Sequence, residues 1–151
     1  MDGNSLMKLL GAWTHHSWGR GAEESQIAKA EQQLGCTLPA DYVSFLRNLG
    51  WCDAGPFEVY GLGSDVPWHL ELIRNTCWER HKARPRLWRH LIPVYPDGGG
   101  NHMCLDTSRI EGDHCSVVYW IHDCLPEEQA EVWFPSFDAW LRDQFGTPDS
   151  A

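Results

Sequence analysis

A run of five residues that suits neither a helix nor a strand, Pro96-Asp97-Gly98-Gly99-Gly100, lies between two apolar segments. Residues 91–95 before this run and residues 101–105 after it have the composition of short strands. Glycine reaches positive φ values without steric cost, and proline cannot donate to a sheet from the middle of a strand. The sequence therefore predicts a β-hairpin with a tight, glycine-rich loop.

A phosphate-binding loop is the alternative interpretation of three consecutive glycines. Such a loop opens a helix, and a lysine and a serine or threonine usually follow it. Here the glycines lead into a predicted strand, the acidic Asp97 precedes them, and Asn101 and His102 follow. The sequence therefore favours a tight turn over a nucleotide site.

Apolar residues at helical spacing predict helices over residues 4–18, 23–34, 39–49 and 68–82. Pro39 suits the first position of a helix, because the N–H that proline lacks would have no partner there. The helix over residues 68–82 is expected to bury one face that contains Leu70, Ile73 and Cys77.

Further strands are expected at residues 57–60, 116–122 and 132–134, and an amphipathic helix closes the chain at residues 137–145. The segment 116–122 is apolar on both alternating faces, which is typical of a central strand covered on both sides. This order of elements predicts an α+β fold. We expect a single domain in which several helices pack around a mixed, mainly antiparallel sheet.

Charge is distributed unevenly along the chain, whose formal net charge is −9 at pH 7. Residues 96–151 contain 11 acidic and 2 basic residues, whereas residues 61–95 contain 3 and 6. A nucleic-acid-binding protein must neutralise phosphates with lysine and arginine, so the acidic C-terminal third argues against direct nucleic-acid binding. The carboxylates suit either a basic partner or solubility alone.

The expected location is the cytoplasm. The sequence contains no run of about 20 uncharged apolar residues that could cross a membrane, and its first residues lack the pattern of a secretory signal. Its six cysteines could pair in about 15 ways, but a disulfide framework needs an oxidising compartment. Reduced and mostly buried thiols are therefore expected.

Two enzymatic alternatives involve cysteines and histidines. Zinc sites usually contain paired ligands at C-x₂₋₄-C spacing, and the sequence contains no C-x-x-C. Cys104 could act as a nucleophile with His102 or His122, oriented by Asp106. A reactive thiol, however, needs a positive or helix-N-terminal environment, and Cys104 lies in a predicted strand. The sequence therefore favours a protein without catalytic residues, metal or cofactor.

Several segments, taken in order, resemble the SUKH superfamily. They are L-P-A-D-Y-V-S-F-L within residues 27–62, L-I-P-V-Y-P-D-G-G-G-N-H-M-C-L-D-T-S at 91–108, V-V-Y-W-I-H-D at 117–123 and S-F-D-A-W-L at 136–141. The resemblance covers residues 23–146. It leaves residues 1–22 as an N-terminal helical extension and residues 147–151 as a flexible tail.

This resemblance implies an α+β domain that is not an enzyme. Most often, such a domain is a bacterial immunity protein that binds and blocks a toxin, commonly a nuclease, encoded by an adjacent gene. Related domains occur in a fungal cell-wall synthesis regulator, so a regulatory or scaffold domain with a host protein partner is the alternative. Structural roles are expected for these residues of the motifs: Pro39, Asp41, Tyr42, Asp97, Gly98, Gly99, Gly100, Asn101, Asp106 and Trp120.

Toxin contacts are expected from carboxylates and from tryptophans near loops. The candidates are Glu111, Asp113, Asp123, Glu127, Glu128, Glu131, Trp51 and Trp68, and Trp18 is also expected to be exposed. The first two carboxylates precede the strand at 116–122 and the others follow it. At ~3.3 Å per residue, the two groups are expected about 23 Å apart, near opposite ends of that strand.

Overall fold

The computed structural model describes residues 1–124 and 131–149 and confirms the α+β class. Its helices and strands are α1 (Gly3–Gly11), β1 (His16–Trp18), α2 (Glu24–Leu34), α3 (Ala40–Asn48), β2 (Cys52–Ala54), β3 (Phe57–Val59), the 3₁₀ helix η1 (Trp68–Leu70), α4 (Leu72–His81), β4 (Leu91–Pro96), β5 (His102–Asp106), β6 (Val117–Trp120), β7 (Glu131–Phe134) and α5 (Phe137–Phe145).

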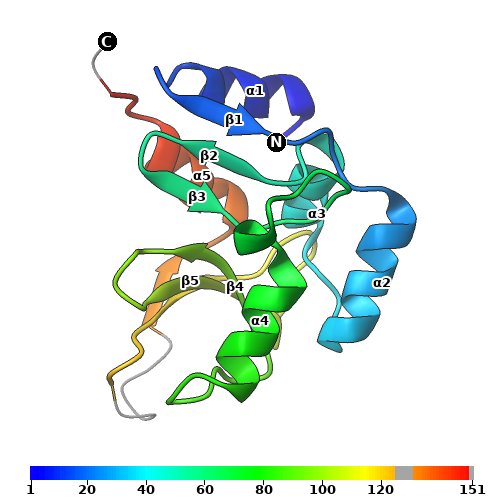
Figure 1. The fold of residues 1–151 in the computed structure, drawn as a ribbon, viewed down its shortest axis with the longest axis vertical. Coiled ribbons are helices and arrows are strands. Elements are labelled where there is room, and N and C mark those ends of the chain that lie inside the picture. Colours follow the sequence, from blue (N-terminus) through cyan, green and yellow to red (C-terminus); the bar gives the residue numbers. More distant parts are fainter. Residues whose placement is uncertain (125–130, 150–151) are drawn as a thin grey trace.

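The strands form two antiparallel sheets, whereas the sequence predicted one mixed, mainly antiparallel sheet. One sheet has the order β1-β2-β3 and the other has the order β4-β5-β6-β7. They lie in the upper and lower parts of the molecule in Figure 1, with α4 beside β4. The backbone N–H of Tyr60, just after β3, donates to the carbonyl of Val94 in β4 at 2.8 Å. The two sheets therefore meet between β3 and β4.

Local signals set the ends of the helices. At the start of α2, Glu23 and Gln26 form a reciprocal capping box, and Gly35 ends this helix with φ 74°. Ser136 caps α5 by accepting a hydrogen bond from the backbone N–H of Ala139 at 3.1 Å. Across the described residues, 1–124 and 131–149, no helix combines the length and apolar character needed to cross a bilayer.

Buried aromatic side chains of α3 and α5 form the centre of the core. The Phe137 ring contacts the rings of Tyr42 and Phe45, with centroids 4.9 and 5.4 Å apart. α1 packs against both helices through Leu6 and Leu10, which are fully buried. The division of the chain at residue 22 stays a prediction.

Three predictions about local structure were wrong. The expected helix over residues 4–18 ends at Gly11, and His16–Trp18 forms β1, which pairs with an unpredicted strand, β2. The expected helix over residues 68–82 is divided into η1 and α4. The buried face of α4 contains Leu72, Thr76 and Arg80, whereas Cys77 is exposed.

Candidate protein-binding surface

The side chain of Asp97 closes the loop between β4 and β5. Its Oδ1 atom accepts hydrogen bonds from the backbone N–H groups of Gly99 at 2.8 Å and Asn101 at 3.1 Å. Gly98 and Gly100 have φ values of 85° and 97°, which residues with a Cβ atom rarely adopt. The predicted glycine-rich hairpin is therefore confirmed.

A hydrogen-bond network joins this loop to the end of β6. The Tyr119 hydroxyl donates to Asp97 Oδ2 at 2.6 Å, and Asn101 Nδ2 donates to the Tyr119 oxygen at 3.1 Å. Asn101 Oδ1 accepts a hydrogen bond from the backbone N–H of His122 at 3.0 Å and lies 2.7 Å from His122 Nδ1. Because every member contacts another, the network holds the loop in one arrangement.

The same contacts set the charge of the network. Partial burial raises the pKa of Asp97, but hydrogen bonds from Tyr119, Gly99 and Asn101 outweigh burial and hold this pKa below its ordinary value. The hydrogen bond to Asp97 raises the pKa of Tyr119. At neutral pH the loop therefore carries a fixed negative charge, and the Tyr119 hydroxyl remains a donor.

We expect Asp97→Ala to lower the free energy of unfolding by about 2 kcal/mol, because it removes an ionised acceptor shared by three donors. Asp97→Asn keeps an oxygen for the two backbone N–H groups and should cost about half as much. Urea denaturation at pH 7 measures both values. Equal losses in the two variants would contradict the role given to the Oδ1 contacts.

β7 presents exposed apolar side chains at the edge of its sheet. Val132 is 60% exposed and Trp133 is 51% exposed. A register shift places Trp133 between the pairs Val117–Phe134 and Val118–Val132, and its ring packs on that of Tyr119 with centroids 4.8 Å apart. An edge strand that presents apolar side chains is a ready contact site for another chain.

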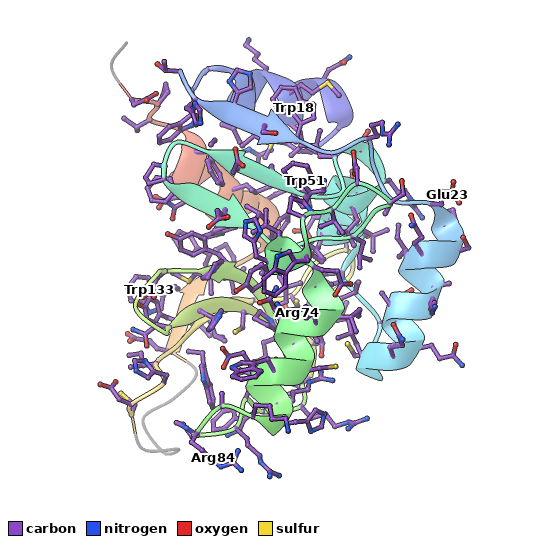
Figure 2. The ribbon with its side chains drawn as sticks, viewed as in Figure 1. Trp18, Glu23, Trp51, Arg74, Arg84 and Trp133 are labelled. Carbon is purple, nitrogen blue, oxygen red and sulfur yellow. The ribbon has the colours of Figure 1, made fainter. Side chains whose placement is uncertain are left out.

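We call Asp97, Tyr119, Glu131 and Trp133 the β7 surface. Glu131 is exposed and lies opposite Tyr119 in the β6–β7 pair, so it extends the negative charge of Asp97 toward the sheet edge. Figure 2 shows Trp133 well apart from Arg74 of α4. The β7 surface therefore combines carboxylates with a large aromatic ring that packs on Tyr119.

The other described carboxylates that were expected to contact a toxin lie in the loops before and after β6. Glu111 lines a cavity of about 300 Å³, and Val132 of β7 lines the same cavity. The backbone carbonyl of Asp113 accepts a hydrogen bond from the N–H of Asp41 at 3.4 Å. Asp123 is exposed just after β6. Glu127 and Glu128 lie outside the described residues.

The tryptophans expected at the surface have different environments. Trp68 is 66% exposed, as predicted, and Trp18 is partly buried. Trp51 is buried, and its Nε1 donates to Asp65 Oδ1 at 3.2 Å, so the expectation that it is exposed was wrong. The sequence reasoning missed the exposed Trp78 and Trp133. For Trp78 a signal existed, since helical spacing places it on the face of α4 opposite the buried one.

Comparison with known proteins agrees with this architecture. A crystal structure of a protein from Pseudomonas syringae pv. tomato matches with a TM-score of 0.65 and 22% identity, over 94% of this chain and 97% of that one. The SPbeta prophage-derived uncharacterized protein YokK of Bacillus subtilis (strain 168) is 24% identical, over 65% of this chain and 61% of YokK. The chain thus spans about three fifths of that relative.

The family model SUKH_5, described as SMI1-KNR4 cell-wall, matches residues 6–146. The chain belongs to this SUKH family. The match confirms the family expected from the sequence motifs, and membership of this family is commonly associated with immunity proteins.

The SUKH motif around α3 connects distant parts of the fold. Pro39 is the residue immediately before the first turn of α3. Asp41 Oδ2 accepts a hydrogen bond from the backbone N–H of Asp138 at 3.2 Å. The buried Tyr42 hydroxyl donates to the carbonyl of Tyr60 at 2.7 Å, and burial raises its pKa well above the ordinary value. This motif therefore joins α3 to α5 and to the end of β3.

The other motif residues also have structural contacts in this SUKH domain. Asp106 Oδ1 accepts hydrogen bonds from the backbone N–H and the hydroxyl of Ser108, at 3.1 and 2.6 Å. Trp120 is buried, and its ring meets that of Trp88 edge-on with centroids 5.4 Å apart. The first contact orders the loop after β5, and the second packs β6 against the segment before β4.

The thiol of Cys104 is fully buried in β5. Burial raises its pKa well above the ordinary value, and its Sγ lies 3.9 Å from the carbonyl oxygen of His102. A nucleophilic thiol needs access to a substrate and a lowered pKa. The environment of Cys104 is the opposite of the one that a catalytic thiol requires. Within residues 1–124 and 131–149, no three His, Cys, Asp or Glu side chains gather as metal ligands.

Proposed function

We propose that this SUKH protein is a cytoplasmic immunity protein that binds a toxin protein through the β7 surface and blocks the toxin's substrate-binding site. The observation that carries the proposal is Trp133, which is half-exposed on an edge strand, packed on Tyr119 and bordered by Glu131. Tryptophan is enriched among the residues that contribute most binding energy at protein interfaces. Its rigid support reduces the entropy lost on binding.

Charge supports a basic toxin surface as the target. A toxin that is a nuclease needs a cationic groove to hold phosphates. The ionised Asp97 and the exposed Glu131 can occupy such a groove in place of the substrate's negative charge. The accessible surface is 7871 Å², so an interface of about 800 Å² would use roughly a tenth of it.

The test is co-expression with the toxin encoded by the gene adjacent to this one. We expect protected cells and a stable complex on size-exclusion chromatography. Trp133→Ala should weaken the complex by about 10-fold or more, because it removes the exposed aromatic ring that the toxin would cover. Glu131→Lys should weaken it further by placing a cation against a basic surface.

Met7→Ala is the matched control, since Met7 is an exposed apolar residue on α1. It should leave affinity within about twofold. Absence of a complex together with unprotected cells would overturn the proposal. In that case a host protein partner, as in a regulatory or scaffold domain, becomes the explanation to pursue.

A further inference from the structure

The outward face of α4 has side chains typical of an interface, and among the described residues no other helix or strand covers it. Arg74, Trp78 and Lys82 follow one another at intervals of four residues, so they form a stripe along two turns. Trp78 is 60% exposed. The stripe lies opposite Leu72 and Thr76, which are fully buried beneath the helix. The burial pattern therefore leaves a large indole ring in solvent.

The Trp68 ring holds Arg74, the first residue of this stripe, in position. The guanidinium carbon of Arg74 lies 3.6 Å from the centroid of the Trp68 ring, which is the geometry of a cation–π contact. Trp68 itself is 66% exposed. The contact restricts the rotamers of Arg74 while its N–H groups remain able to donate to a ligand. We call Trp68, Arg74, Trp78, His81 and Lys82 the α4 surface.

The cations of this region have no acidic partners within the described part of the chain. Arg74, Lys82, Arg84 and Arg86 make no ion pair there, whereas Arg20 and Arg47 pair with Asp65 and Glu24 elsewhere on the molecule. Arg84, labelled in Figure 2, lies beyond the C-terminal end of α4.

The two carboxylates nearest in sequence to the stripe make other contacts. Glu71 accepts a hydrogen bond from the backbone N–H of Arg74 at 2.6 Å, and Glu79 lies 3.6 Å from the buried His102. An acidic protein thus presents a local set of cations that its neighbouring carboxylates do not neutralise.

From this arrangement we propose that the α4 surface is a second docking site, which binds an acidic amphipathic helix of a partner protein. Arg74, Asn75, Cys77, Trp78, His81 and Lys82 line a shallow groove of about 560 Å³. At 1.5 Å per residue, Arg74 and Lys82 are about 12 Å apart along α4, with Trp78 midway. A helix with two glutamates eight residues apart and a leucine between them matches this spacing.

A second copy of this chain does not provide that pattern from its described helices. Among the described helices only Glu23, Ile27 and Glu31, at the start of α2 and within it, have this spacing. Ile27 is buried in the core and cannot contact a partner. Single-stranded nucleic acid also binds cations and aromatic rings. The net charge of −9 opposes any anionic partner, but it opposes a strand with one phosphate per nucleotide more strongly than a helix with two glutamates, so a protein helix is favoured. This site lies apart from the β7 surface, and the proposal does not depend on the toxin.

The probe is a synthetic helical peptide of about 16 residues with a Glu-x₃-Leu-x₃-Glu stripe on an alanine and glutamine background. Its control has the same composition in scrambled order. Binding is followed by NMR through the indole N–H signals, which Trp68→Phe and Trp78→Phe assign. We expect both signals to shift, with a Kd of about 100 μM at low salt, and the scrambled peptide to bind about 10-fold more weakly.

The charge-reversed variant Arg74→Glu/Lys82→Glu should weaken peptide binding by about 10-fold or more. Its matched control is Lys8→Glu/Lys29→Glu, which makes the same change in net charge at exposed positions of α1 and α2 and should keep affinity within about twofold. Unshifted Trp78 signals at about 1 mM peptide, or equal binding of the scrambled peptide, would overturn the proposal. So would tighter binding of an oligonucleotide of about 12 thymidines, which would identify the site as one for nucleic acid.

Discussion

Trp140→Ala is expected to lower the free energy of unfolding by about 4 kcal/mol, the largest effect of any substitution considered for this protein. Trp140 is fully buried on α5, within the SUKH motif S-F-D-A-W-L. Its ring contacts those of Tyr95, Phe137 and Phe145, with centroids 5.4, 5.6 and 6.1 Å apart. Truncation therefore removes an aromatic ring from the centre of the core and leaves a cavity between α5 and β4.

Trp140→Phe separates the packing of the ring from the indole N–H. Trp140 Nε1 is buried and has no hydrogen-bond partner within the described part of the chain. Losing an unsatisfied donor offsets part of the lost volume, so we expect a loss of about 1–2 kcal/mol. Trp133→Ala serves as the surface control and should cost less than about 1 kcal/mol. Equal losses for Trp140→Ala and Trp140→Phe, measured by urea denaturation, would contradict this account of the core.

The parts of the fold that follow from local chemistry were predictable from the sequence. The hairpin depends on Asp97, Gly98 and Gly100, whose turn geometry is decided within a few residues. The end of α2 at Gly35 and the start of α3 immediately after Pro39 are local in the same sense. Such signals do not depend on tertiary contacts, so the sequence alone predicts them.

The parts that depend on distant contacts were not predictable in this way. β1 and β2 have three residues each and owe their conformation to the pairing of β1 with β2 and of β2 with β3. On α4 the buried face includes Arg80, whose guanidinium donates to the carbonyls of Leu34 at 2.9 Å and Arg89 at 2.6 Å. An apolar pattern cannot anticipate a buried cation whose partners come from α2 and from the loop before β4.

The candidate surfaces also depend on distant contacts that the sequence could not predict. The sequence identified the acidic character of residues 111–131 but could not show which carboxylates meet an aromatic ring. That depends on the pairing of Glu131 with Tyr119 and on the bulge at Trp133. Likewise, Trp51 packs into the core, and its indole N–H donates to Asp65, fourteen residues away. Exposure is a property of the packed molecule, and proximity to a loop is a poor guide to it.

His102 should make the protein less stable in mild acid. Its side chain is 5% exposed, Nε2 lies 3.6 Å from Glu79 Oε1, and Nδ1 is buried without a partner in the described part of the structure. Burial lowers the pKa of His102 to about 4, from an ordinary value of 6.5. Asp97 raises this pKa and His122 lowers it, and both effects are smaller than that of burial. Between these two pH values the unfolded chain binds a proton that the folded chain does not.

The neutral His102 imidazole therefore makes its full contribution to the free energy of unfolding above pH 6.5. This contribution decreases by about 3 kcal/mol in total as the pH falls toward 4. His102→Gln removes the titrating group. We expect the loss of unfolding free energy between about pH 7 and 4.5 to be some 2 kcal/mol smaller in this variant than in the unsubstituted protein. His15→Gln, at an exposed histidine, is the matched control and should keep the original pH dependence. Parallel stability profiles for the unsubstituted protein and His102→Gln would show that the buried imidazole does not link folding to pH. Burial also raises the pKa values of Asp41 and Glu79. Because these carboxylates titrate in both proteins, their contribution cancels in the comparison.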